Sequence, residues 1–427
     1  DWAKRWWVDQ LREVEAGLAQ RIELPPRGGN WYHWYVCPDD GTPLKIGKRL
    51  GKWQWKHTCS LCGKTWSGGT PDNPSRDFDG CQIRQVHFDY AQAVRGCGLA
   101  WQVTGDDRYL ERSRQILLAY AGKYLDYPLH KNRGGSGIGG GRVASQSLTE
   151  ASWLVPIVQG ADLIWADLSE IDRNAIADRL FLPAARDVIL PHRLGIHNIQ
   201  CWKNSAVGLV GFLMGDEKLI WEAIDEPQRG YRAQMEQGVT PDGSWYEGAW
   251  GYHFYTLRGT WPLTEAARNC GVDLYDSPIQ AMFDAPIRLM SPTGVLPAFN
   301  DSGQVSVRGQ AWLYELAYAR FQNPDYLPLL AGHTREEMAV LYGARELPQT
   351  ADLPIERSAD YRDAGYAILT RGKGREATWL CLDYGPHGGG HGHPDKLGFV
   401  LFARGAELAV DPGTARYGTP LQRSWFR

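Results

Sequence analysis

One pattern covers residues 84 to 345: apolar residues recur at helical spacing, and short polar or glycine-containing breaks separate the runs. Residues 86–105 and 108–128 follow this spacing, and Pro128 ends the second run. Further runs of this kind lie at residues 145–165, 168–189, 203–216, 216–225 and 261–271. Successive antiparallel helices joined by short loops are typical of an α/α toroid or a helical bundle. The number of helix pairs favours the toroid.

After about residue 350 the pattern changes to short β-type runs with glycine-rich turns between them. The runs are residues 363–372, 376–385, 397–405 and 406–413. Short apolar segments bounded by such turns predict antiparallel strands. They are too few for a closed sandwich before the sequence ends at Arg427, so we expect a further, C-terminal fragment to complete the β domain.

The composition is that of an ordinary globular protein. Hydrophobic residues make up 43% and charged residues 22% of the 427 residues, and no apolar run is long enough to span a bilayer. The net charge of −3 gives no general attraction for a polyanion, so the sequence predicts neither a nucleic-acid nor a membrane partner. The chain opens on DWAKRWW without a signal peptide; we expect that any export signal has been removed and that the protein is periplasmic or secreted.

Aromatic residues are unusually frequent, with 19 tryptophans and 20 tyrosines. Aromatic rings along a groove grip the apolar faces of sugars, whereas in a large helical core they fill space. We expect core packing for most of them.

Three of the eight cysteines have a spacing that resembles a zinc ribbon. Cys59 and Cys62 form an intact CxxC knuckle, and Cys37 stands alone in CPDDG, where a second knuckle is expected. The candidates for a fourth ligand are His33, Asp40, His57 and Cys81. The segment is therefore a candidate structural zinc site, or a ribbon that has lost its metal and kept its shape.

The segment HGHPDK places His391 and His393 one residue apart, and Asp411 follows on a predicted neighbouring strand. In an extended segment the two imidazoles point to opposite faces. One of them would serve a substrate groove, and the other would bind a metal together with Asp411. The alternative is a glycine-rich hairpin whose histidines are merely polar.

Two other segments carry candidate catalytic residues. His197 and Asn198 precede a helix expected to begin near Lys203, and Tyr252 and His253 follow about fifty residues later. This set suits abstraction of a proton α to a carboxylate, followed by β-elimination. An amide or imidazole donor would stabilise the enolate, a neutral His or an ionised Tyr would take the proton, and a Tyr hydroxyl would return one to the leaving oxygen. The alternatives are a helix-start role for His197 and a core or groove-lining role for Tyr252.

Two other functions compete with this reading. A glycoside hydrolase is possible in a toroid, because Asp242, Glu247 and Asp301 offer carboxylates for an acid–base pair, but it leaves the His and Tyr residues unexplained. A non-catalytic sugar-binding protein is the other alternative, and the intact catalytic candidates argue against it.

Four motifs, in this order and at these separations, resemble the heparinase II/III-like superfamily of polysaccharide lyases: HNIQCWKNSAVG, DGSWYEGAWGYH, HGHPDKLGFVLFARG and DPGTARYG. The family includes heparin and heparan sulfate lyases, other glycosaminoglycan lyases and oligoalginate lyases. The resemblance covers nearly the whole chain. It implies an α+β multidomain fold, an incomplete (α/α) toroid followed by an antiparallel β-sandwich, with the active site between them. The expected division is an N-terminal segment with the ribbon at 1–83, the toroid at 84–345 and the start of the sandwich at 346–427.

The resemblance also implies roles for single residues. His197 matches a base or charge neutraliser, Tyr252 a general acid, and His391 a histidine that reaches into the cleft, while Asn198 is the expected amide neutraliser. The residues expected to contact substrate are Arg142, Gln146, Trp202, Glu247 and His253.

The resemblance further implies a structural metal. His393 and Asp411 match two ligands of a divalent ion, usually zinc, whose third ligand would follow Arg427. No organic cofactor is expected.

The expected function is cleavage of a uronic-acid polysaccharide by β-elimination, which leaves an unsaturated uronate. Sulfated glycosaminoglycans require Lys and Arg near the cleft. Lys131, Arg133, Arg142 and Lys203 stand in segments that could face it, so we expect heparin, heparan sulfate, chondroitin or hyaluronan as substrate; the alternative is that these four residues are ordinary surface charges. Alginate or oligoalginate, which needs mainly carboxylate neutralisers, is the alternative.

Overall fold

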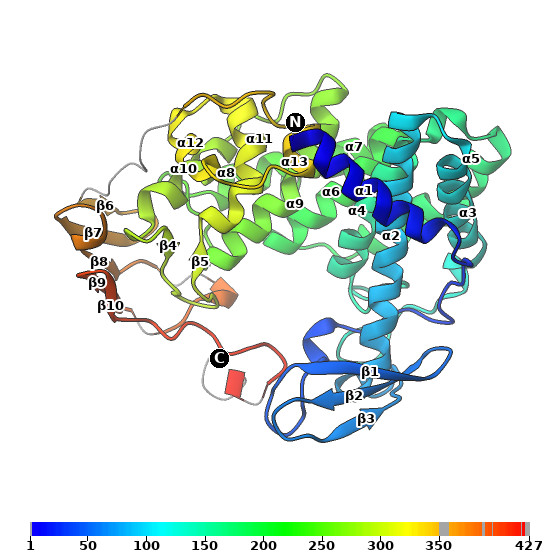
Figure 1. Cartoon of the computed structure of the whole chain (residues 1–427), viewed down its shortest axis with the longest axis horizontal. Helices are drawn as coiled ribbons and strands as arrows, with labels where there is room; N and C mark the ends of the chain where they lie inside the picture. Colours follow the sequence, from blue (N-terminus) through cyan, green and yellow to red (C-terminus); the bar gives the residue numbers. More distant parts are fainter. Residues whose placement is uncertain (1, 350–357, 387–388, 395, 420, 423–427) are drawn as a thin grey trace.

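Helices form one large curved body, with a small sheet at one end and a larger sheet on another side (Figure 1). The computed structural model describes residues 2–349, 358–386, 389–394, 396–419 and 421–422. The fold class expected from the sequence, a helical toroid followed by an antiparallel β region, is confirmed.

Antiparallel neighbours build the helical body. Its helices are α2 (Phe78–Thr104), α3 (Asp107–Lys123), α4 (Ser147–Asp162), α5 (Glu170–Ile176), α6 (Asn198–Met214), α7 (Glu217–Ile224), α8 (Tyr231–Gly238), α9 (Trp250–Asn269), α10 (Ile279–Leu289), α11 (Ala311–Phe321), α12 (Leu327–Leu330) and α13 (Glu337–Leu341). Helix α2 packs on α3 and α4, α4 packs on α6, and α6 packs on α7 and α9. After α5 the chain continues through π-type turns, η5 (Ala177–Phe181) and η6 (Pro183–Ile189), beside Pro183, which has no N–H to donate.

The core confirms that many of the aromatic rings fill space. The fully buried large side chains include Trp153, Trp245, Trp379, Tyr109, Tyr120, Tyr124, Tyr127, Tyr231, Tyr314 and Tyr326. One continuous cluster of buried side chains runs from the helices into the inner face of the larger sheet. The toroid and this sheet therefore share one hydrophobic core.

Two helices begin earlier than the sequence pattern predicts. Helix α6 begins at Asn198, not near Lys203, and α9 begins at Trp250, eleven residues before the expected start. The first turns of α6 carry polar side chains that are nevertheless buried, because they hydrogen-bond to one another: Gln200 Nε2 donates to Asn204 Oδ1 at 2.7 Å. Hydropathy alone reads such a segment as a loop.

The N-terminal region has two parts. Helix α1 (Trp2–Leu18) packs on α2 and α3 through an apolar cluster that includes Trp7, Leu11 and Val14. Strands β1 (Leu44–Gly51), β2 (Gln54–Cys59) and β3 (Thr65–Ser67) form an antiparallel sheet, preceded by a short helix η1 (Tyr32–Trp34). His57 Nε2 of β2 lies 2.9 Å from Asp79 Oδ1 of α2, so the sheet is attached to the first turn of that helix.

The larger sheet is an antiparallel meander. Its strands are β6 (Ala359–Tyr361), β7 (Tyr366–Arg371), β8 (Thr378–Asp383), β9 (Phe399–Ala403) and β10 (Ala406–Ala409), in the order β10-β9-β8-β7-β6. The four predicted runs correspond to β7–β10, and β6 was not predicted. The ring of Tyr366 stacks between those of Trp250 and Phe299, which fixes the sheet against the helices. A smaller pair, β4 (Val295–Leu296) and β5 (Val305–Ser306), lies nearby.

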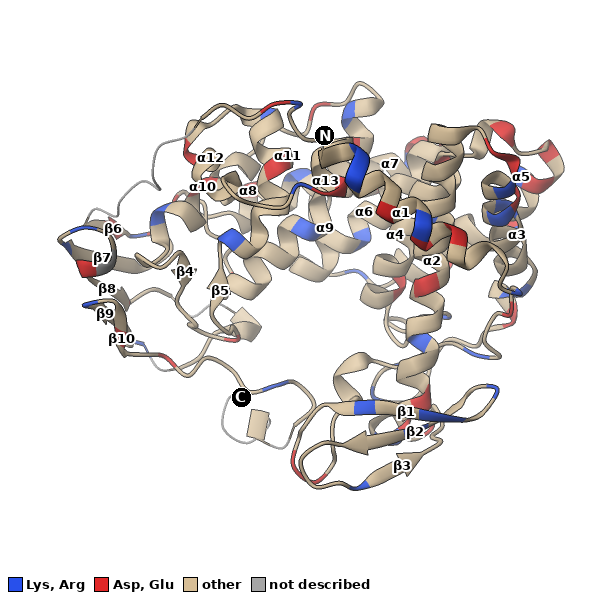
Figure 2. Ribbon diagram, viewed as in Figure 1, with Lys and Arg blue, Asp and Glu red and all other residues tan. Residues whose placement is uncertain are grey.

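Lys and Arg are interspersed with Asp and Glu along the helices (Figure 2). Of the described helices, none is both long enough and apolar enough to cross a membrane.

Candidate active site

A cavity of about 610 Å³ lies where three parts of the chain meet. Trp31, His33 and Trp34 of the N-terminal region form one wall. The toroid contributes residues from α4, α6 and α9, and the C-terminal region contributes His391 and Tyr417. None of the described residues that line the cavity is an Asp or a Glu. An anionic ligand would therefore meet no carboxylate among the described lining residues, and these residues offer no carboxylate pair for hydrolysis.

His197 is the N-cap residue of α6. Its Nδ1 accepts the N–H of Ile199 at 3.2 Å, so in the neutral ring the proton is on Nε2. Burial lowers the pKa of His197, and nearby His391 acts in the same direction, although Glu247 opposes them. The ring is therefore a neutral hydrogen-bond donor at the edge of the cavity.

Asn198 and Glu247 form a buried pair beneath His197. The Asn198 amide nitrogen lies 2.8 and 3.1 Å from the two Glu247 oxygens, and the Trp245 indole donates to the same carboxylate at 3.0 Å. Asn198 borders the cavity, but its side-chain N–H is directed to Glu247. The role of Asn198 as carboxylate neutraliser stays a prediction. Glu247 does not line the cavity; its carboxylate accepts hydrogen bonds from Asn198 and Trp245.

Tyr252 and His391 lie face to face. Their ring centroids are 3.7 Å apart and their planes differ by 18°. Tyr252 Oη donates to Tyr417 Oη at 2.9 Å, and Tyr417 Oη donates to Asp301 Oδ2 at 2.7 Å. A chain of hydroxyl groups thus connects the predicted general acid to a buried carboxylate.

Asp301 holds this arrangement together. His391 Nδ1 lies 2.9 Å from Asp301 Oδ2, and His393 Nε2 lies 3.2 Å from Oδ1. Burial alone would raise the pKa of Asp301, but hydrogen bonds from His391, Tyr417, His393 and Thr414 outweigh it and hold that pKa well below its usual range. An ionised Asp301 places the Nδ1 proton on His391 and leaves Nε2 of the neutral ring as an acceptor.

The extended conformation assumed for this segment was wrong. Residues Gly389–His391 form a short 3₁₀ helix, η10, because the glycine-rich segment turns instead of extending. His391 lines the cavity, whereas His393 is buried and does not line it, and the two rings contact different oxygens of Asp301. Asp411 lies after β10, in a loop, where it accepts the N–H of Gly413 at 2.8 Å.

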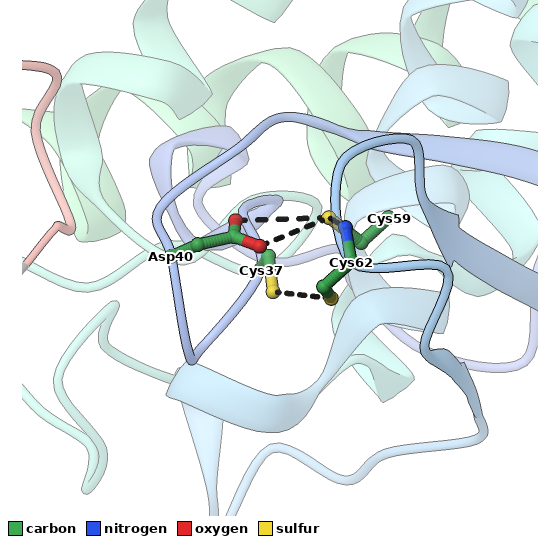
Figure 3. Close-up of side chains that lie close together, drawn as sticks. All are labelled: Cys37, Asp40, Cys59 and Cys62. Atoms are coloured by element: carbon green, nitrogen blue, oxygen red, sulfur yellow. Dashed lines mark hydrogen bonds between the residues drawn. The ribbon is translucent and has the colours of Figure 1, made fainter.

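Two groups of described residues bring three or more metal-ligand atoms within 4.8 Å of one another. They are His197 with Glu247 and His391, and Cys37 with Asp40, Cys59 and Cys62 (Figure 3). His393 and Asp411 belong to neither group. Their imidazole and carboxylate are donor types that zinc accepts, so a metal at this pair stays a prediction.

Of the predicted substrate-binding residues, Gln146 lines the cavity as the N-cap residue of α4. Arg142 lies outside the lining and donates to two backbone carbonyls. His253 is buried, with its ring nitrogens bonded to backbone groups, and the Trp202 indole donates to another backbone carbonyl. These three side chains stabilise the structure around the site; they do not line it.

The cations that suggested a sulfated substrate do not surround the cavity. Of the four named from the sequence, only Arg133 lines it. Lys203 is buried, where it donates to the backbone carbonyl of His192 and to Gln200, and burial lowers its pKa to about 7. The expectation of a basic groove was therefore wrong.

Several lining residues were missed in the sequence. Tyr417 stands inside the DPGTARYG motif without a role having been assigned to it, and the aromatic run WYHW at Trp31–Trp34 was the signal for the N-terminal wall. Burial, followed by Arg416 and Arg84, lowers the pKa of His33 to about 4. Asp301, the centre of the network, was named only as a hydrolase carboxylate, and its neighbours in sequence gave no sign of its role.

Comparisons with known proteins agree with this architecture. Residues 72–291, more than half of the chain, match the family model described as Alginate lyase, and residues 354–427 match Heparinase II/III-like, C-terminal. Both families consist of polysaccharide lyases. Within that class, the chain belongs to the alginate lyase family. The resemblance noted in the sequence is thus confirmed.

Two curated relatives have alginate in their names. The exo-oligoalginate lyase of Saccharophagus degradans is 27% identical over 375 residues, which cover 80% of this chain and 49% of that protein. The alginate lyase of Stenotrophomonas maltophilia is 28% identical over 369 residues, covering 80% and 48%. The chain thus spans about half the length of these relatives.

Solved structures share the fold. The crystal structure of heparinase III superposes with a TM-score of 0.55 at 15% identity and covers 99% of this chain and 66% of that one. An alginate lyase from Bacteroides ovatus gives 0.53 at 16% identity, with 80% and 93% covered.

Proposed function

We propose that this protein is an alginate or oligoalginate lyase. The observation that carries the proposal is the cavity in which Tyr252 and His391 lie face to face next to His197, with no carboxylate among the described lining residues. Alginate is a polymer of uronates, so each sugar brings a carboxylate that such a cavity accepts. Among the described lining residues Arg133 is the one Lys or Arg, and this, together with the names of the two curated relatives, favours alginate over a sulfated glycosaminoglycan.

The reaction begins with the carboxylate of the sugar whose C5 proton is removed. Nε2–H of His197 is placed to donate to that carboxylate, which withdraws charge from C5 and stabilises the enolate as it forms. The low pKa of this imidazole keeps it a neutral donor at neutral pH. His197 is accordingly our candidate for the neutraliser.

Proton transfer follows at the neighbouring imidazole of His391, whose ring centroid lies 6.3 Å from that of His197. His391 takes the C5 proton at Nε2, because Asp301 binds Nδ1–H and later stabilises the imidazolium. The electron pair from the C5–H bond forms the C4–C5 double bond, and the C4–O bond breaks. Tyr252 gives its hydroxyl proton to the departing oxygen. The products are an unsaturated uronate and a new sugar hydroxyl, and no water is consumed.

A divalent metal at His393 and Asp411 is part of the proposal as a structural element only. These two residues would hold the ion next to the Asp301 network, where it would keep the loops of the β region in place. No step of the elimination uses it. A polymer-degrading enzyme of this kind would act in the periplasm or outside the cell.

The test is absorbance near ~232 nm, where the new C4–C5 double bond absorbs, during incubation with alginate, polymannuronate, polyguluronate, heparin and chondroitin sulfate in parallel. We expect a rise with one or more of the alginate polymers. A rise only with a glycosaminoglycan would overturn the substrate, and release of reducing ends without absorbance would overturn the lyase reaction.

A further inference from the structure

The N-terminal sheet carries two loops of the same design. Residues 37–41, CPDDG, and residues 59–63, CSLCG, each place a candidate ligand, two spacer residues, a second candidate ligand and a glycine. In each loop the glycine N–H donates to the carbonyl of the first cysteine, at 2.9 Å for Gly41 and 3.1 Å for Gly63. Both glycines have a positive φ, 75° and 72°. Asp40 therefore occupies in the first loop the place that Cys62 occupies in the second.

We propose that Cys37, Asp40, Cys59 and Cys62 bind one Zn²⁺ ion. The four ligand atoms lie within 4.8 Å of one another and converge on one point between the two loops (Figure 3). Cys37 Sγ and Cys62 Sγ are 3.8 Å apart, and Cys59 Sγ lies 3.3 and 3.6 Å from the Asp40 oxygens.

These separations match the edges of a zinc tetrahedron. With Zn–S of about 2.3 Å and Zn–O of about 2.1 Å, the S–S edge is about 3.8 Å and the S–O edge about 3.6 Å. A disulfide would require about 2.05 Å between sulfurs. The cysteines of this cluster are accordingly free thiols.

Backbone N–H groups orient two of the four candidate ligands. The N–H groups of Leu61 and Cys62 both lie 3.4 Å from Cys59 Sγ, and the N–H of Thr42 donates to Asp40 Oδ1 at 2.8 Å. Such hydrogen bonds orient metal ligands and stabilise their charge.

The other sequence candidates for the fourth ligand have different partners. His57 lies between Tyr35 Oη and Asp79 Oδ1, at 2.9 Å from each. Cys81 Sγ is directed to the backbone carbonyls of Trp31 and Asp77, and His33 lines the substrate cavity. Asp40 is the candidate that the fold brings to the three cysteines.

The cluster adjoins a wall of the cavity, because Trp34 of that wall packs against the buried group of side chains that contains Cys37 and Cys59. Trp31, His33 and Trp34 line the cavity, and the chain reaches Cys37 three residues later. The backbone of Gly418, beside Tyr417, packs so closely on the His33 carbonyl that a Cβ at this glycine would come within 2.4 Å of the oxygen. If the proposed lyase function holds, the ion fixes this wall, and its loss raises KM more than it lowers kcat.

Metal content tests the site without any substrate. Zinc per chain is measured by elemental analysis in the unaltered protein, in Asp40→Ala and Cys62→Ala, and in Cys270→Ala, which removes an exposed free cysteine outside the cluster. We expect each cluster variant to lose one equivalent of zinc and Cys270→Ala to lose none. Equal zinc in all four proteins would overturn the proposal.

Cobalt gives an independent readout. Exchange of zinc for Co²⁺ should produce sulfur-to-metal charge-transfer absorption, which strengthens in Asp40→Cys, where a fourth thiolate replaces the carboxylate. Absence of that absorption, or a Cys37–Cys62 disulfide in peptide mapping of the protein purified without reductant, would contradict the site. A lyase assay that fails while the zinc is present would instead overturn the function alone.

Discussion

At the scale of single residues, the site depends on one buried carboxylate. Asp301 binds His391, His393 and Tyr417, and through Tyr417 it reaches Tyr252. The histidine and tyrosine motifs could be recognised along the sequence because each is local. Their common partner could not, because Asp301 lies 90 residues from His391 and only the tertiary structure brings them together.

Replacement of Tyr252 by Phe removes only the hydroxyl that protonates the leaving oxygen in the proposed reaction. We expect kcat to fall by about 10²- to 10⁴-fold, as for loss of a general acid, with an unchanged melting temperature. Tyr255→Phe is the matched control, because it removes another hydroxyl from the lining of the same cavity. Full activity of Tyr252→Phe on alginate would show that this residue is not the acid.

Replacement of Asp301 by Asn keeps the size of the side chain and removes its charge. Because His391 then loses the partner that fixes its tautomer, we expect kcat to fall by roughly 10²-fold or more and the acid limb of the pH–rate profile to shift. Asp301→Glu should recover part of the activity. A lower melting temperature with an unchanged pH profile would assign Asp301 a structural role only.

Asp301 also makes stability depend on pH. Its folded pKa lies below that of an unfolded aspartate, so its contribution to the free energy of unfolding is complete above the unfolded pKa and is lost as pH falls through the folded one. We therefore expect the free energy of unfolding of the unaltered protein to fall as the pH is lowered below about 5, and that of Asp301→Asn to fall less over the same range. Urea unfolding at matched salt measures both.

At the scale of secondary structure, the helices of the toroid approach closely where glycines face each other. Gly98 of α2 and Gly160 of α4 lie at such a crossing: a Cβ at Gly160 would come within 2.6 Å of the Arg95 backbone. The helical period of α2 and α4 was readable in the sequence, but this crossing was not.

Gly160→Ala should therefore reduce the free energy of unfolding by about 1–3 kcal/mol, because a methyl group has no space between the two backbones. The control is Gly122→Ala in α3, where nothing lies within 4 Å and the helix should gain up to about 1 kcal/mol. Chemical denaturation measures both. A neutral Gly160→Ala would mean that α2 and α4 can separate at little cost.

At the scale of the whole molecule, the cavity exists only because three distant regions of the chain meet. The N-terminal region, the toroid and the C-terminal region each contribute a wall. A structural metal at His393 and Asp411 would act at this scale, since it would hold loops and not a reacting atom.

His393→Ala should accordingly lower the melting temperature more than Tyr252→Phe does, and it should lower the metal content of the purified protein. Differential scanning calorimetry of the two variants, with elemental analysis, tests this. Equal melting temperatures would contradict a structural role for the pair.

The sequence by itself determined the features that depend on near neighbours: the helical period of the toroid, the β runs after residue 350, the spacing of the ribbon cysteines and the His and Tyr motifs. Only the tertiary structure decided that buried polar residues begin α6 and that His391 and His393 share Asp301. It also decided that Lys203 and Arg142 stay out of the cavity. Periodicity and turns arise within a few residues, whereas burial and hydrogen-bond partners depend on which distant segments pack together.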